Sequence, residues 1–150
     1  MTKTKSTQAQ AAAMIRAYCK QHGIKAEVRS SSFAGGNDVT CVVTDLETDR
    51  FKALASYVKQ FQYGTFDGMT DYYSADNRRA DLPQVKFAFC ERRFSEEAMQ
   101  RAWTFAIGYY ADSQGFPALL EDARRANVRD AAGYYADQIA RKALCDGKVA

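Results

Sequence analysis

The chain is poor in histidine, proline and tryptophan, with one His, two Pro and one Trp among 150 residues. A serine nucleophile needs a neighbouring base to take its proton. The only imidazole is that of His22, which lies at the end of a predicted helix, where a histidine is favoured by the helix dipole. The sequence also lacks a Gly-x-x-x-x-Gly-Lys-Ser/Thr phosphate loop. We therefore expect no catalytic residues, no cofactor and no enzymatic activity.

Long apolar runs and paired metal-binding cysteines are also missing. No apolar run approaches the ~20 residues that a membrane span needs. The polar start, Met1–Ser6, has no apolar segment behind it and does not resemble a secretory signal. The four cysteines are far apart and form no Cys-x-x-Cys pair, which argues against a zinc site; they are Cys19, Cys41, Cys90 and Cys145. We expect reduced thiols in a cytoplasmic protein that does not bind membranes.

Hydrophobic periodicity predicts helices and strands in a mixed order. Helices are expected over Thr7–His22 and Asp49–Gln60, and strands over Lys25–Arg29, Val39–Thr44 and Val85–Glu91, with a short strand at Asp71–Ser74. Helical segments follow from Ser95, with breaks near Pro117 and Val128, up to Cys145. The expected fold class is α+β: a small antiparallel sheet of three to four strands, covered on one face by the first two helices. Residues 1–150 are interpreted as a single domain, with an α+β core over 7–95 and a helical extension over 96–150.

Two polar, glycine-bearing stretches, Arg29–Asp38 and Tyr63–Tyr73, lie between the predicted elements and are interpreted as loops. Loops carry function more often than core segments do. Tyr, Phe and Arg are the residue types that protein interfaces favour. The candidate partner-binding residues, which extend to one arginine pair beyond the second loop, are Arg29, Ser30, Ser31, Phe33, Gly35, Gly36, Asn37, Tyr63, Phe66, Asp67, Gly68, Met69, Asp71, Tyr72, Tyr73, Arg78 and Arg79.

Other functions fit parts of the same segments. Arginine pairs next to Tyr and Phe suit phosphate contacts and base stacking, so a nucleic-acid-binding module is the alternative; the pairs are Arg78-Arg79, Arg92-Arg93 and Arg124-Arg125. A net charge of +3 is too small to require a polyanionic partner. Asp67, Asp71 and Asp76 could gather around a hard cation, although Asp-Gly is itself a strong turn former.

A five-residue echo links two predicted C-terminal helices. Gly108-Tyr-Tyr-Ala-Asp112 recurs as Gly133-Tyr-Tyr-Ala-Asp137. Consecutive helix residues lie about 100° apart, so one Tyr of each pair can enter the core while the other points outward. We expect a homodimer through residues 96–145; the alternative is that both tyrosines pack within one chain.

Three blocks in the first two thirds of the chain resemble the large polyvalent protein-associated domains of phages and conjugative elements. They are Val28-Arg-Ser30 leading to Gly35-Gly36, a following strand that ends in Thr44-Asp45, and Phe66-Asp-Gly-Met-Thr-Asp71. The resemblance covers about residues 12–95. It departs from the family pattern at Cys41-Val-Val43, where an aromatic residue is expected.

The resemblance implies a small α+β domain with no established reaction, from a mobile element that acts in the host cytoplasm. It implies a protein that binds a host defence complex, such as a CRISPR or restriction system, and inhibits it by covering a surface. No catalytic residue is carried over from the family. The positions that match its pattern imply a shared surface and are Arg29, Ser30, Gly35, Gly36, Asp67, Gly68 and Asp71.

Overall fold

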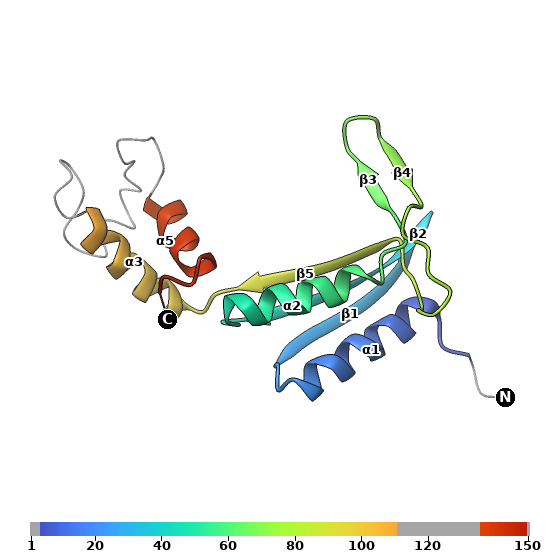
Figure 1. Cartoon of the computed structure of the whole chain (residues 1–150), viewed down its shortest axis with the longest axis horizontal. Helices are drawn as coiled ribbons and strands as arrows, with labels where there is room; N and C mark the ends of the chain where they lie inside the picture. Colours follow the sequence, from blue (N-terminus) through green and yellow to red (C-terminus); the bar gives the residue numbers. More distant parts are fainter. Residues whose placement is uncertain (1–3, 111–135, 150) are drawn as a thin grey trace. The chain divides into compact units, whose positions relative to one another are not determined.

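The computed structural model describes residues 4–110 and 136–149 (Figure 1). The chain divides into two compact units, Met1–Arg93 and Phe94–Ala150. This boundary lies close to position 96, where the helical extension was expected to begin. Among the described residues, no helix has both the length and the apolar character needed to cross a membrane.

The first unit is an α+β domain, as the sequence predicts. Its elements are α1 (Thr7–Gln21), β1 (Ala26–Phe33), β2 (Gly36–Thr44), α2 (Thr48–Lys59), β3 (Thr65–Asp67), β4 (Tyr72–Ser74) and β5 (Phe87–Arg93). Strands β1, β2 and β5 form one sheet in that spatial order, and β3 and β4 form a separate two-stranded hairpin. Strand β4 matches the short strand expected at Asp71–Ser74, whereas β3 was not predicted.

The sheet is mixed rather than antiparallel. Strands β1 and β2 pair antiparallel, as expected, with Ala26 opposite Val43 and Phe33 opposite Gly36. Strand β5 pairs parallel to β2, with Asp38 opposite Phe87 and Thr44 opposite Arg93. The physical reason is the crossover: α2 carries the chain back along the sheet, so that the next strand enters from the same end as β2.

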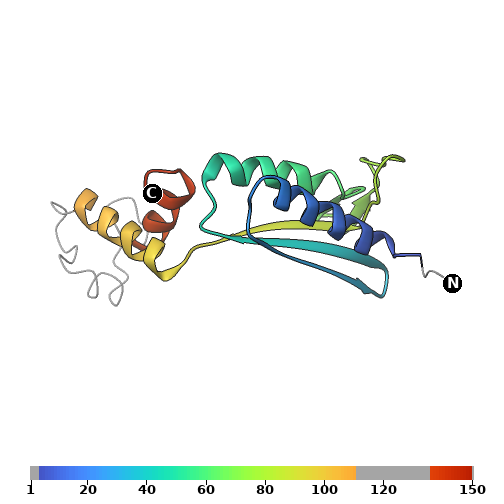
Figure 2. The same cartoon turned by 90° about the horizontal axis from the view of Figure 1, so that it is seen from below.

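The core lies between the sheet and two helices that cover one face of it, as predicted (Figure 2). Ala11 and Ala12 are fully buried on α1, and their small side chains let this helix approach the strands closely. Alternate residues of β2 face the helices. The main core residues are Ile15, Cys19, Val28, Val39, Cys41, Val43, Leu54, Val58, Phe61 and Val85.

The segment Arg29–Asp38 is a tight hairpin, not the loop that the sequence suggested. Strand β1 continues through the three serines to Phe33, which pairs with Gly36. Only Ala34 and Gly35 remain in the turn, and Gly35 adopts a φ of 90°. A positive φ at the second turn position is what a type II turn requires, which accounts for the glycine.

The second unit contains α3 (Glu96–Tyr110) and α5 (Ala136–Cys145). Ser95 caps α3 as predicted, because its hydroxyl accepts a hydrogen bond from the backbone N–H of Ala98 at 3.2 Å. Trp103 packs among alanines from both helices. The helix expected near Pro117 and the tyrosines Tyr134 and Tyr135 lie outside the described residues, so the predicted homodimer through this segment stays a prediction.

Candidate functional site

The candidate site is the face of the three-stranded sheet that lies opposite α1 and α2, called here the outer face. Alternation along each strand sends every second side chain to this side. Within the first unit no helix covers it (Figure 2). Its residues are Glu27, Arg29, Ser31 and Phe33 on β1, Asp38, Thr40, Val42 and Thr44 on β2, and Phe87, Phe89, Glu91 and Arg93 on β5.

One end of the outer face is an aromatic ridge of five rings: Tyr63, Tyr73, Phe87, Phe33 and Phe89. Phe87 stacks on Phe89 with ring centroids 5.9 Å apart and on Phe33 at 6.3 Å. Tyr73 packs in T-shaped geometry against Phe87, with ring centroids 5.6 Å apart, and against Tyr63, with ring centroids 5.4 Å apart. Phe33 is 44% exposed and Phe89 46% exposed. The ridge therefore presents two partly exposed rings, Phe33 and Phe89, which pack against the less exposed ring of Phe87.

Two cations lie against the ridge. The Lys86 ammonium is 5.5 Å from the Tyr73 ring and 5.6 Å from the Phe87 ring, and it donates a hydrogen bond to the Gly35 carbonyl at 3.1 Å. The Arg78 guanidinium lies 5.3 Å from the centre of the Tyr63 ring. Each contact is of cation–π type and helps to fix the position of a ring.

The other end of the outer face carries charges of both signs in rows across the sheet. Val42 lies between Glu27 and Glu91, and Thr40 lies between Arg29 and Phe89. Each acid pairs with a basic residue on its own strand: Glu27 with Arg29, and Glu91 with Arg93 at 3.6 Å. A shallow depression of about 460 Å³ lies over these side chains. Because each arginine is next to a carboxylate, this end has no excess of positive charge.

The β3–β4 hairpin projects from the sheet near the ridge (Figure 1). Gly64 allows this hairpin to close, because a Cβ at that position would lie 2.0 Å from the carbonyl oxygen of Ser74. At the tip, the carboxylate of Asp67 accepts hydrogen bonds from the backbone N–H of Met69 at 2.9 Å and the hydroxyl of Thr70 at 2.8 Å. These bonds hold the pKa of Asp67 below its ordinary value.

The tip of the hairpin presents apolar side chains to solvent. Met69 is 97% exposed and Tyr72 is 64% exposed, and Phe66 is about half exposed. Asp71 has a φ of 53°, a left-handed conformation that Asp tolerates in turns. The tip is therefore an ordered turn with exposed apolar groups, as a contact surface requires.

The buried side chain of Gln62 links the hairpin to the sheet by hydrogen bonds. It donates to the Gly64 carbonyl at 2.7 Å and accepts from the Ala88 N–H at 3.0 Å. Both polar groups of this buried amide are thereby satisfied. Tyr73 adds a second connection through a hydrogen bond from its hydroxyl to the Lys86 carbonyl, and burial raises its pKa.

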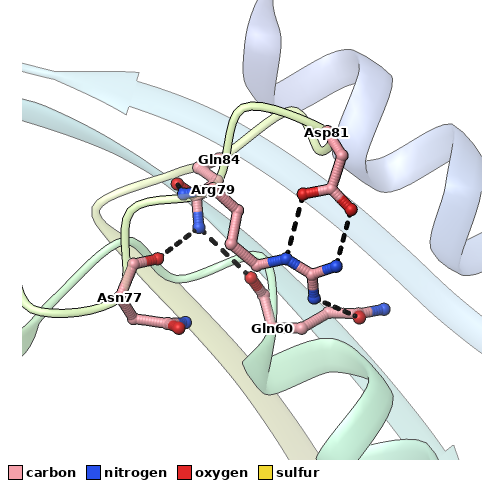
Figure 3. A network of polar contacts seen from close by, with 5 residues as sticks. All are labelled: Gln60, Asn77, Arg79, Asp81 and Gln84. Carbon is pink, nitrogen blue, oxygen red and sulfur yellow. Dashed lines mark hydrogen bonds and ion pairs between the residues drawn. The ribbon is translucent and has the colours of Figure 1, made fainter.

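The segment after the hairpin is held by a polar network around Arg79 (Figure 3). Arg79 binds the Asp81 carboxylate through two nitrogens, at 3.0 and 2.6 Å, and donates to Gln60 at 3.2 Å. Gln84 donates to the Asn77 carbonyl at 2.7 Å. Arg79 was predicted as a partner-binding residue, but its donors are engaged in fixing its own loop.

The structure brings together only part of the predicted partner-binding set. Arg29, Ser31 and Phe33 lie on the outer face, and Tyr63 and Tyr73 belong to the ridge. Strand alternation turns Ser30 and Asn37 to the helix side. Asn37 accepts a hydrogen bond from the Lys86 N–H at 3.0 Å and has a structural role. The glycines serve turns and close approaches, and the exposed hairpin residues are Phe66, Asp67, Gly68, Met69, Asp71 and Tyr72.

The strand β5 residues of the site were missed by sequence reasoning. The predicted strand Val85–Glu91 contains Phe87 and Phe89, and alternation sends both to one face, which in the structure is the open one. Ala88 and Cys90, on the other side, pack towards the helices. Both faces of β5 carry apolar side chains, Phe87 and Phe89 on one and Ala88 and Cys90 on the other, so alternation alone does not say which face is buried. The two large aromatic side chains on one face were the sequence feature that could have indicated the ridge.

The two arginine pairs within the described residues, Arg78-Arg79 and Arg92-Arg93, do not act as pairs. Arg92 and Arg93 are neighbours on a strand and therefore face opposite sides. Arg92 lies 5.5 Å from the centre of the Phe51 ring and donates to the Thr48 hydroxyl, both on α2. Arg124-Arg125 lies outside the described residues. In the part of the chain that the structure describes, Asp67, Asp71 and Asp76 do not form a group that could hold a metal ion.

Comparisons with known proteins identify a family. Residues 6–99 match the family model described as Large polyvalent protein associated domain 29. A search of curated proteins and a search of solved structures each found no match. The matched segment includes the whole sheet, both covering helices and the hairpin. The chain therefore belongs to the family of large polyvalent protein associated domains, as a member of domain family 29.

Proposed function

We propose that this domain is a protein-binding module of a mobile element, and that it inhibits a host defence system by covering a surface of a defence protein. The family places the domain among those associated with polyvalent proteins. The main observation in support of binding is the aromatic ridge. It lies at the end of the outer face from which the β3–β4 hairpin projects, and the tip of that hairpin also exposes apolar side chains.

The composition of this surface favours a protein as the partner. Aromatic residues and arginine are enriched in protein interfaces, and the residues that dominate binding are commonly of these types. On the outer face, Arg29 and Arg93 stand against the acids Glu27, Glu91 and Asp38, and Lys86 lies beside the ridge. A balanced surface of this kind suits mixed polar contacts around an aromatic centre better than it suits a polyanion.

The proposal is tested by defence assays with variants of the exposed rings. Phe89→Ala and Phe66→Ala remove a ring from the ridge and from the hairpin. Each is expected to weaken binding by about 2 kcal/mol, or about 30-fold in Kd, if these rings anchor the partner. Lys59→Ala, at the end of α2 on the covered side, is the matched control and should have no effect.

Two outcomes contradict the proposal in different ways. Full inhibition by folded Phe89→Ala and Phe66→Ala would show that the contact surface is elsewhere. A wild-type protein with no effect on phage or plasmid entry, in hosts carrying restriction or CRISPR systems, would refute the defence role but leave protein binding open.

The second candidate function is nucleic-acid binding, and one observation favours it: Lys86 and Arg78 lie beside aromatic rings. Such a site would bind phosphates and stack bases. Against it, the Arg78 guanidinium already occupies one face of Tyr63. A gel-shift titration at two salt concentrations decides the matter, because each phosphate contact contributes about −0.9 to the slope of log K against log salt. Lys86→Ala should reduce that slope by about one contact if nucleic acid is bound.

A further inference from the structure

Strand β1 forms an edge of the sheet, because it pairs with β2 on one side and with no other strand in the described residues. In an antiparallel pair, residues alternate between those that bond to the neighbouring strand and those whose N–H and C=O point away from it. A two-residue hairpin closes on a hydrogen-bonded pair, here Phe33 and Gly36. Counting back from that pair, the backbone N–H and C=O groups of Ser31 and Arg29 bond to β2. Those of Ser32, Ser30 and Val28 point to the open edge.

A contact from α1 supports this assignment. The Arg16 side chain donates a hydrogen bond to the Val28 carbonyl at 2.6 Å, which requires that carbonyl to face away from β2. Arg16 thereby caps the first part of the edge. The serines further along, Ser30 and Ser32, are exposed residues. Their backbone groups form the uncapped part of the edge.

The uncapped part of the edge, Arg29–Phe33, also lacks the usual protection against strand pairing. Natural edge strands are commonly blocked by proline, lysine, a β-bulge or a charge that points inward. This segment contains no proline and no lysine, its register with β2 is continuous, and its three consecutive serines have small side chains. Its one charged side chain, Arg29, is paired with Glu27 on the same strand. The serines therefore leave room for a second strand, as long as the residue opposite Arg29 does not carry a like charge.

We propose that the occupant of this edge is the same segment of a second copy of the chain, paired antiparallel about a two-fold axis at Ser31. In this register each Ser30 exchanges its two backbone hydrogen bonds with Ser32 of the second copy. The Val28 carbonyl, which Arg16 holds, stays outside the new ladder. Two sheets of three strands then become one continuous sheet.

The segment is complementary to itself in this register. Ser31 lies opposite Ser31, so the closest side chains at the axis are small. Arg29 lies opposite Phe33 on the outer face, where a guanidinium can lie over a ring. A shift of the axis to Arg29 would instead place two arginines directly opposite each other, which is unfavourable. Self-complementarity of this kind is what a two-fold interface requires.

The dimer is tested with the full chain by sedimentation over a range of concentrations. Ser32→Pro removes an N–H that points to the open edge and leaves the ladder with β2 intact. We expect the wild type to show concentration-dependent dimers, Ser32→Pro to be monomeric, and the matched control Ser32→Ala to dimerise like the wild type. A homodimer through residues 96–145, by contrast, would survive Ser32→Pro. Amide spectra of Ser32→Pro should show that the hairpin is retained.

A cysteine scan tests the register independently of any effect of proline on folding. In a Cys145→Ala background, Ser31→Cys places two thiols opposite each other at a pair that is not hydrogen-bonded across the interface, where Cβ atoms are about 4.5–5.5 Å apart. Mild oxidation should cross-link Ser31→Cys dimers rapidly and Thr44→Cys, at the far end of β2, slowly. A wild-type monomer at every concentration up to about 1 mM, a dimer that survives Ser32→Pro, or equal cross-linking at both positions would overturn the proposal.

Discussion

The exchange of Gly64 for alanine tests whether the hairpin and the aromatic ridge depend on a close backbone approach. A Cβ at Gly64 would lie 2.0 Å from the Ser74 carbonyl oxygen and 2.5 Å from Cε1 of Tyr73. The first of these atoms belongs to the backbone and can move only if β4 moves. Inserting a methyl group into a well-packed site costs about 1–3 kcal/mol, and we expect the upper part of that range here.

Gly68→Ala is the matched control within the same hairpin. Its Cβ would meet a single neighbour, the Phe66 ring, at an ordinary contact distance of 3.8 Å. The φ of Gly68 is not positive, so alanine fits the backbone. Because alanine also restricts the unfolded chain, Gly68→Ala should leave stability unchanged or raise it by about 0.4–1 kcal/mol.

The assay is amide hydrogen exchange on the full chain, read separately at hairpin and core positions. In Gly64→Ala, protection at Thr65 and Ser74 should fall, and proton contacts between the Tyr73 and Phe87 rings should weaken. The Val39 amide reports on the central strand β2. If only the hairpin detaches, the protection of Val39 stays at the wild-type level, whereas it falls if the whole domain is destabilised. If Gly64→Ala retains wild-type protection and the same ring contacts, the packing argument for the hairpin is wrong.

Three further predictions concern buried and titrating groups. Gln62→Leu leaves the Ala88 N–H and the Gly64 carbonyl without their buried partner and should destabilise the first unit by about 1–3 kcal/mol in urea unfolding; the exposed Gln100→Leu, on α3, serves as control. The pKa of Asp67 is lowered, so its bonds at the hairpin tip are complete above its ordinary value of 3.8 and lost as pH falls through the lower folded value. Amide shifts of Met69 should titrate accordingly, and Thr70→Ala should move the midpoint upward. Burial raises the pKa of Cys19 to about 12, so native alkylation followed by mass spectrometry should modify the exposed Cys145 well before Cys19; comparable rates would contradict the burial of Cys19.

Local sequence patterns were sufficient for the elements of the first unit. Apolar residues at helical spacing predicted α1 and α2 within a residue or two of their bounds, because both helices bury a single stripe. Alternation predicted the β1–β2 pair, and the Ser95 cap predicted the start of α3. The α+β class follows from the order of these segments, since each pattern is a property of consecutive residues.

The length of the hairpin and the composition of the site were decided by tertiary structure. Three serines and two glycines favour a loop by composition, yet pairing with β2 extends β1 to Phe33. Strand propensity depends on the neighbouring strand more than on the residue itself, so this outcome is not readable from the segment alone.

The candidate site shows the same division between local and non-local causes. The sequence by itself placed Phe87 and Phe89 two positions apart in one predicted strand, which puts them on one face because side chains alternate along a strand. The predicted strand ended at Glu91, and only the structure extends β5 to Arg93 and so separates Arg92 from Arg93. The sequence did not determine which face the helices cover, nor that β5 runs parallel to β2. Those outcomes depend on where the crossover through α2 delivers the chain, and this is set by contacts between residues far apart in sequence. The aromatic ridge is therefore a product of the tertiary structure, made from residues whose local pattern was visible from the start.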